Sequence, residues 1–182
     1  GFLPSWKRSG RQLSPFDTGA TNRPVVYSRD GSALLTGDNQ GRIVVLRVDR
    51  SAPRREIPAH RGTVTAVALS PDGDLLATAA ADSTVKLWTY PEIDPVRSLE
   101  GHAGAVEDLE FSPDGGLFAS CGEGGTIRLW DPESGESLGI LRAGTSTVHD
   151  IAFDGEGRRL LSASRDGTAR IWDVATRRLV RS

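Results

Sequence analysis

Residues 101–142 read GHAGAVEDLEFSPDGGLFASCGEGGTIRLWDPESGESLGILR, and the same plan returns every 42 residues along the chain. Three columns of this repeat show the period without any insertion: Trp88, Trp130 and Trp172; Thr36, Thr78, Ser120 and Ser162; Val64, Val106 and Val148. A fixed period of about 20 to 50 residues is the signature of a repeat architecture, in which each copy forms one structural unit. The sequence therefore predicts four consecutive units of the same fold.

Each copy contains four short strand-forming runs separated by turn residues. In the third copy the runs are 105–111, 117–121, 126–130 and 137–141, and the first turn is Ser112-Pro113-Asp114-Gly115. Short β-rich runs at this spacing indicate antiparallel sheets, because Asp, Gly, Pro and Ser stabilise tight turns. Four strands per 42 residues predict one propeller blade per repeat. The expected fold is an all-β propeller of four-stranded antiparallel blades.

The period also sets the expected organisation of the chain. Repeats 1 to 4 cover residues 17–58, 59–100, 101–142 and 143–182. The segment that begins at Trp6 parallels the one that begins at Trp172, so residues 1–16 are predicted to be the last two strands of a preceding blade. About four blades are expected, either as a partial propeller or as a segment of a larger one.

Paired residues at fixed places in the repeat point to one family. Gly101-His102 opens the third copy and Trp130-Asp131 closes its third strand, while Asp166-Gly167-Thr168 precedes Ile171-Trp172-Asp173 in the fourth. Over nearly its whole length the chain resembles the WD-repeat β-propeller proteins, although the first two copies end in Leu46-Arg47 and Trp88-Thr89. The resemblance implies a non-catalytic scaffold for protein–protein interaction, usually one module of a larger regulatory protein.

Composition excludes several other classes of function. The chain has 182 residues and a net charge of −2, so it lacks the basic excess with which most proteins bind nucleic acid. No apolar run approaches the length of a membrane span, and there is no signal-peptide pattern, so a cytoplasmic location is expected. Cys121 is the lone cysteine, predicted to be an inert buried thiol, and the three histidines are far apart. No metal and no cofactor is expected.

Histidine, hydroxyl and carboxylate residues recur in the repeat and could be mistaken for a hydrolase relay. The resemblance instead implies a structural hydrogen-bond chain from Trp through Ser or Thr to His and Asp. The second copy is complete, whereas Gly124 replaces the aspartate of the third copy and Gly144 the histidine of the fourth. The expected members are His60, Thr78, Asp82 and Trp88; His102, Ser120 and Trp130; and Ser162, Asp166 and Trp172. Buried polar side chains need such partners, and no catalytic residue is expected.

Two columns of the repeat vary in charge while their neighbours do not. They lie where the first strand of each blade starts and where the second ends, which the topology places on one face of the propeller. The candidate partner-binding residues are Arg23, Asn39, Thr65, Glu107, Glu123, His149 and Arg165. An acidic sector at Glu107 and Glu123 would lie beside a basic one at His149 and Arg165. Free drift on a solvated rim is the alternative explanation.

Two further alternatives remain open from the sequence. Some propellers are enzymes with an active site at the channel mouth, which would require converging carboxylates or histidines, and the sequence offers only a scattered few. Four blades would also leave the apolar faces of the first and last blades open, and soluble proteins rarely expose large apolar patches. The chain is therefore expected to associate, either with a second copy to give about eight blades or with the rest of a parent chain.

Overall fold

The computed structural model describes residues 24–49 and 52–182, so Arg23 and the strands predicted within 1–16 lie outside the described residues. These residues form four antiparallel sheets of four strands each, which confirms the predicted all-β fold. Blade 1 contains β1 (Val25–Tyr27), β2 (Ala33–Gly37), β3 (Arg42–Arg47) and β4 (Arg55–Pro58), and blade 2 contains β5 (Val64–Leu69), β6 (Leu75–Ala80), β7 (Val85–Thr89) and β8 (Pro95–Leu99). Blade 3 contains β9 (Val106–Phe111), β10 (Phe118–Gly122), β11 (Thr126–Trp130) and β12 (Ser137–Arg142), and blade 4 contains β13 (Val148–Phe153), β14 (Arg159–Ser164), β15 (Ala169–Asp173) and β16 (Arg178–Arg181).

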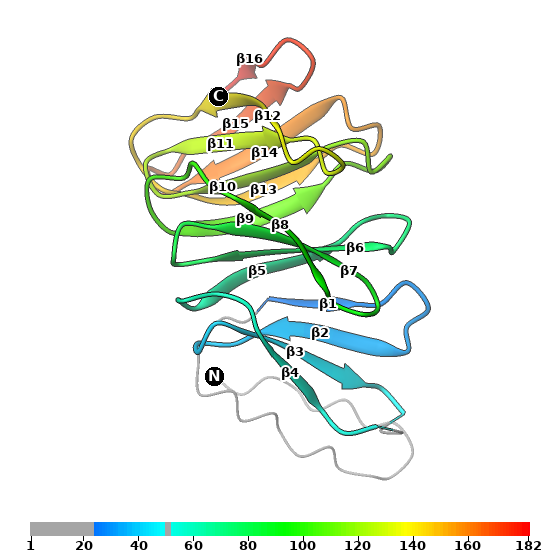
Figure 1. The fold of residues 1–182 in the computed structure, drawn as a ribbon. Coiled ribbons are helices and arrows are strands. Elements are labelled where there is room, and N and C mark those ends of the chain that lie inside the picture. Colours follow the sequence, from blue (N-terminus) through cyan, green and yellow to red (C-terminus); the bar gives the residue numbers. More distant parts are fainter. Residues whose placement is uncertain (1–23, 50–51) are drawn as a thin grey trace, which may run out of the picture.

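The blades stack face to face, as the colour order in Figure 1 shows. Between blades 3 and 4 the core contains Cys121, Ile127 and Leu129 from one sheet and Leu160 and Trp172 from the next. The alternation of a strand places these side chains on one face of each sheet, and burial of that face against the next blade stabilises the stack. The tryptophan column therefore marks the face by which each blade packs on its predecessor.

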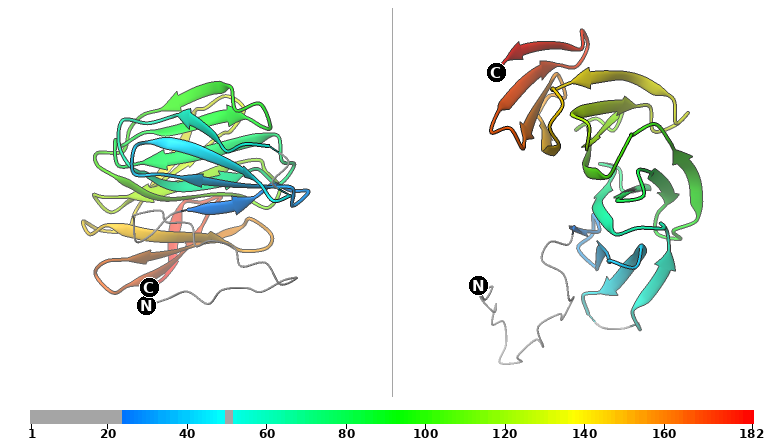
Figure 2. Two further views of the ribbon diagram at one scale, coloured as in Figure 1. Left: turned by 90° about the horizontal axis from the view of Figure 1, so that it is seen from below. Right: turned by 90° about the vertical axis from the view of Figure 1, so that its left-hand side faces the viewer.

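The first strands of neighbouring blades lie next to one another, with β9 between β5 and β13. In each sheet the strands then follow in chain order from this inner strand outward. The right-hand view of Figure 2 shows the result, in which the four blades fan around an arc that stays open within the described residues. The inner strands consequently surround the axis of the arc, and the fourth strands form its outer rim.

The last blade presents a face that its predecessors bury. The side chain of Leu161 in β14 is 45% exposed, whereas Ala119 and Ala77, at the same place in blades 3 and 2, are 0% exposed. Ala169 and Ile171 of β15 belong to the same exposed or half-buried face. This face of blade 4 is defined here as the open face.

Within the described ranges, no helix has the length and apolar character that a membrane span requires.

Candidate functional site

The candidate partner-binding residues lie at one end of the blades, here called the top face. It consists of the loops that enter each first strand (59–63, 100–105 and 143–147) and the turns between second and third strands (38–41, 81–83, 123–125 and 165–167). Antiparallel pairing of the first two strands brings the start of one beside the end of the other. The structure therefore gathers the predicted residues of blades 1 to 4 on this face, apart from Arg23.

One of the two variable columns occupies a β-bulge in each of blades 2 to 4. In blade 2 the pairing jumps from Val64↔Ala80 to Ala66↔Ala79, so Thr65 is left unpaired. The same shift leaves Glu107 unpaired in blade 3 and His149 in blade 4. A bulge frees one residue from the ladder and re-aims its side chain, and bulges are common beside functional sites. These three residues are the second residues of the inner strands β5, β9 and β13, at the top face.

The candidate residues differ in their exposure and in the hydrogen bonds that they form within the protein. Asn39, His149 and Arg165 are exposed. The Thr65 hydroxyl donates to the carbonyl of Val106 in the next blade, and a carboxylate oxygen of Glu123 accepts the Ala105 amide at 3.1 Å. Thr65 and Glu123 thus have local structural contacts that the variation between copies does not reveal.

The hydrogen-bond chain of blade 2 runs from the core to the top face. Trp88 Nε1 donates to Thr78 Oγ1 at 2.9 Å, and Thr78 Oγ1 lies 2.8 Å from His60 Nε2. On the other side of the ring, His60 Nδ1 lies 3.0 Å from Thr84 Oγ1 and 3.3 Å from Asp82 Oδ1. Burial lowers the pKa of His60 below its ordinary value although Asp82 opposes this. The buried imidazole is neutral and structural.

Thr84 is a member of this hydrogen-bond chain that the sequence reasoning missed. Its hydroxyl donates to Asp82 at 2.7 Å, which leaves its oxygen free to accept from His60. Asp82 also accepts the Arg61 amide at 2.8 Å, so the aspartate would keep partners if His60 were removed. The signal was present in the sequence as a threonine two residues after the aspartate, a spacing at which Asp closes a turn.

In blade 3 the hydrogen-bond chain ends at the histidine. Trp130 Nε1 donates to Ser120 Oγ at 2.8 Å, and Ser120 Oγ lies 2.8 Å from His102 Nε2. Gly124 takes the place of the aspartate, and His102 Nδ1 is buried without a hydrogen-bond partner among the described residues. Burial, and then the charge of Arg128, lower the pKa of His102 to about 4. His102 is therefore also neutral at physiological pH.

Blade 4 corrects one detail of the expected set. Trp172 Nε1 donates to Ser162 at 2.9 Å, but Asp166 is not connected to this pair. Asp166 instead accepts the Thr168 amide at 3.0 Å and an Arg170 guanidinium N–H at 3.4 Å. The reason is Gly144, which stands where blades 2 and 3 have a histidine.

Blade 1 relies on another buried carboxylate that sequence reasoning missed. Thr36 donates to the carbonyl of Pro24 at 2.7 Å and, among the described residues, has no bond to a tryptophan or histidine. Asp38 is 2% exposed and accepts the Arg42 guanidinium at 2.6 Å and the Gln40 amide at 2.9 Å. Burial opposes its ionisation, yet these bonds hold its pKa below the ordinary value. Asp38 and Arg42 form the buried polar centre of this blade's top turn.

Carboxylates converge on the inner strands of blades 3 and 4, where the sequence had suggested only scattered ones. Asp108 of β9 accepts the Ile151 amide at 3.0 Å, and Glu110 accepts the Phe153 amide at 2.7 Å. Burial, and the nearby charge of Asp150, raise the pKa of Asp108 to about 6, and burial also raises that of Glu110. Both side chains thus fasten β9 to β13.

The comparison with known protein families agrees with this geometry. The family described as "WD domain, G-beta repeat" matches residues 51–89, 93–131 and 135–173, which together are more than half of the chain. The chain belongs to this WD-repeat family. Each matched segment begins near the fourth strand of one sheet and ends with the third strand of the next, so the WD repeat is offset from the blade by one strand. No curated protein matches the chain.

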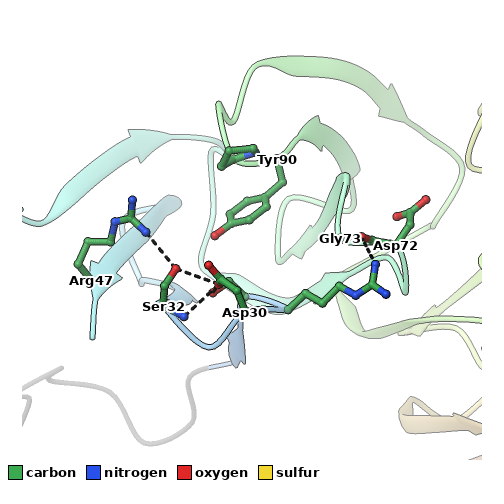
Figure 3. Close-up of a pocket in the computed structure, with 9 residues that line it drawn as sticks. Asp30, Ser32, Arg47, Asp72, Gly73 and Tyr90 are labelled. Atoms are coloured by element: carbon green, nitrogen blue, oxygen red, sulfur yellow. Dashed lines mark hydrogen bonds between the residues drawn. The ribbon is translucent and has the colours of Figure 1, made fainter. Parts of the chain in front are cut away.

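These WD blades also contain a polar hollow away from the top face. A hollow of about 290 Å³ lies between blades 1 and 2, at the end opposite the top face (Figure 3). Several of its polar groups are bonded within the hollow, since Arg47 donates to Ser32 at 3.0 Å and Arg29 donates to the Asp72 carbonyl at 3.0 Å. The bond from Arg29 to the Asp72 carbonyl joins the first turns of blades 1 and 2, whereas the bond from Arg47 to Ser32 lies within blade 1.

Cysteine and potential metal ligands are the remaining side chains with possible chemistry. Cys121 is 0% exposed, and burial raises the pKa of its thiol, which makes it unreactive. No group of three His, Cys, Asp or Glu side chains among residues 24–49 and 52–182 could hold a metal ion.

Proposed function

We propose that the chain is a non-catalytic interaction module that binds a protein partner through its top face. WD-repeat proteins generally act as scaffolds for protein–protein interaction, and the observation that carries the assignment to this face is the repeated bulge. Three blades in succession leave one first-strand residue unpaired at the top face, and its identity changes from Thr65 to Glu107 to His149. A fixed backbone device with a variable side chain is suited to recognition, because the scaffold stays rigid while the contact changes.

The charges of this face favour a partner with a mixed charged surface. Glu107 and Glu123 belong to blade 3, and His149 and Arg165 belong to the neighbouring blade 4. Complementary charge mainly raises the association rate and makes it depend on salt. The partner surface that fits is basic opposite blade 3 and acidic opposite Arg165.

An enzyme with its site at the channel is the weaker alternative. Asp108 has the raised pKa that a general acid needs. One oxygen of this carboxylate is nevertheless engaged by the Ile151 amide, and Glu110 is engaged in the same way. Because these groups join two inner strands, a structural role accounts for the inner carboxylates, and we favour the interaction module over an enzyme.

The open face of blade 4 supports a further part of the proposal, namely that another blade covers it. Leu161, Ala169 and Ile171 are in the positions by which each earlier blade packs on its successor. The covering blade would come from the rest of a larger regulatory protein or from a second copy that completes about eight blades. The cytoplasmic location expected from the sequence stays a prediction.

Binding measurements on charge-reversal variants test the top-face proposal. Glu107→Lys and Arg165→Glu are expected to weaken binding to an isolated partner. The melting temperature should stay nearly unchanged, because Arg165 is exposed and the half-buried Glu107 is unpaired in the strand ladder. Arg178→Glu, on the outer strand β16, is the matched control with the same kind of charge reversal. If the first two variants bind normally while Arg178→Glu abolishes the complex, the partner site is the outer rim.

A further inference from the structure

The top turn of blade 3 lacks a carboxylate that the turns of its neighbours contain. Asp82 stands at this place in blade 2, Asp166 in blade 4 and Gly124 in blade 3. The two aspartates have different partners. Asp82 lies 3.3 Å from His60 Nδ1, and Asp166 accepts a bond from Arg170 at 3.4 Å. The same position can therefore serve a histidine or an arginine as acceptor.

Blade 3 contains both kinds of donor and leaves one nitrogen of each without an acceptor. His102 corresponds to His60, and Arg128 corresponds to Arg170. Within residues 24–49 and 52–182, His102 Nδ1 and Arg128 Nε are buried atoms without hydrogen-bond partners, although Arg128 Nη2 donates to the Gly101 carbonyl. Removing a buried donor from water without providing an acceptor is costly, so such atoms are uncommon.

The surroundings of Ser120 favour one tautomer of His102. Trp130 Nε1 donates to Ser120 Oγ, and His102 Nε2 at 2.8 Å is the acceptor that the described residues offer to the Ser120 hydroxyl. The neutral imidazole then carries its proton on Nδ1, so this atom requires an acceptor and not a donor. Arg128 Nε is likewise a donor in every protonation state. Both atoms thus select for the same kind of group.

The turn at Gly124 leaves open space, and two arginines make its neighbourhood positive. A Cβ atom built on Gly124 would meet no atom within 4 Å, whereas one built on Gly122 would collide with the Ala105 carbonyl. Burial, and to a smaller extent the charge of nearby Arg142, lower the pKa of Arg128. Gly124 adopts the left-handed conformation with φ +81°, which penalises an aspartate at this position. Glu123 is engaged by the Ala105 amide.

We propose that blade 3 binds the carboxylate of an aspartate or glutamate side chain from a protein partner beside Gly124. The bound carboxylate accepts hydrogen bonds from His102 Nδ1 and Arg128 Nε, the role that Asp82 has toward His60 Nδ1 in blade 2. This inference rests on the proposed top-face function and names the chemistry of one contact. The free carboxyl terminus of a polypeptide offers the same group, and the experiment separates the two sources.

Side-chain NMR of the histidines in the whole protein tests the inference with small probes. N-acetyl-aspartate N-methylamide presents a side-chain carboxylate alone, N-acetylglycine presents a terminal one, and sodium chloride at equal ionic strength is the blank. The aspartate probe is expected to shift the His102 nitrogen signals saturably in the millimolar range, as befits a single small contact. His60 is the internal control, because Asp82 already occupies its site.

Matched variants identify the second donor. Arg128→Gln is expected to weaken the aspartate probe roughly tenfold or more, since a hydrogen bond to a charged group is lost. Arg170→Gln, the same change in blade 4, should leave the affinity unchanged, and Glu123→Gln should also keep the His102 shift. The wild-type titration needs no variant, so it remains decisive if Arg128→Gln does not fold.

Several results would overturn the inference. It fails if His102 shows no saturable change, if His60 shifts equally, or if folded Arg128→Gln binds as the wild type does. Equal or tighter binding of N-acetylglycine would overturn the assignment to a side chain. None of these results touches the top-face proposal itself, because the Glu107 and Arg165 variants test that proposal separately with a whole partner.

Discussion

Replacing His60 with alanine is expected to destabilise the protein more than replacing His102, although both histidines occupy the same place in consecutive blades. The His60 side chain is 0% exposed and has contacts at both ring nitrogens, with Thr78 on one side and Thr84 and Asp82 on the other. His102 has a contact only at Nε2 among the described residues. The comparison therefore isolates the bonds made by Nδ1.

The expected difference follows from the bonds that each variant loses. Each net hydrogen bond contributes about 0.5 to 1.5 kcal/mol, and a buried polar group left alone costs about 1 to 3 kcal/mol. Both variants lose the bond to a buried hydroxyl and create a similar cavity. His60→Ala also loses the Nδ1 contacts, whereas His102→Ala removes a donor that had no acceptor. His60→Ala should be more destabilising by about 1 to 3 kcal/mol.

Urea unfolding at neutral pH, where both imidazoles are uncharged, measures this difference. The two variants and the wild type are compared at the same temperature, with similar slopes required before the free energies of unfolding are subtracted. Equal losses, or a larger loss for His102→Ala, would refute the reasoning. Asp82 keeps its bonds to Thr84 and Arg61 in the variant, so the expected loss does not include an unpaired carboxylate.

Three further outcomes follow from burial. Burial and Asp150 raise the pKa of Asp108 to about 6; the folded state thus binds the extra proton, and the free energy of unfolding falls as pH rises from about 4 to about 6. Over this pH range the effect on the free energy of unfolding is at most roughly 3 kcal/mol, and Asp108→Asn should remove it. Urea unfolding at several pH values measures it, and an unchanged pH dependence in the variant would refute the assignment to Asp108. Cys121 should react with a thiol reagent only as fast as the protein unfolds, so rapid labelling of folded protein would contradict its burial. Leu161→Lys should reduce any concentration-dependent association seen by sedimentation, and an unchanged mass distribution would exclude the open face as the contact.

The blades could be predicted from the sequence because their determinants are local. The turn residues and alternating apolar residues repeat within each 42-residue copy, and β11 begins and ends at the residues expected, Thr126 and Trp130. The core residues can be predicted from two patterns, the tryptophan that recurs every 42 residues and the alternation of buried and exposed side chains along each strand. Period and turn chemistry were therefore sufficient for the fold.

The inner carboxylates could not be predicted because their contacts cross between blades. Asp108 meets the Ile151 amide 43 residues further on, and Glu110 meets Phe153 at the same separation. Ala66 and Ala68 stand at the matching places of blade 2, so the repeat contains no column that signals the contact. Only the stacking of two sheets brings such groups together.

The candidate recognition face was found for a reason that the sequence shows only in part. Variation in charge singled out Thr65, Glu107 and His149, but the bulge that leaves them unpaired depends on the register of two strands. Variation alone also selected Glu123, whose carboxylate accepts a loop amide. Charge variation thus locates the face without separating free side chains from those with structural bonds.

Hydrogen exchange of the protein with and without an isolated protein partner tests the central claim most directly. Partner contact on the top face predicts slower exchange at the loops 100–105 and 143–147 and the turns 123–125 and 165–167, with the outer strands β8, β12 and β16 unchanged. Protection confined to those outer strands, with the top-face loops exchanging as in the free protein, would contradict the claim.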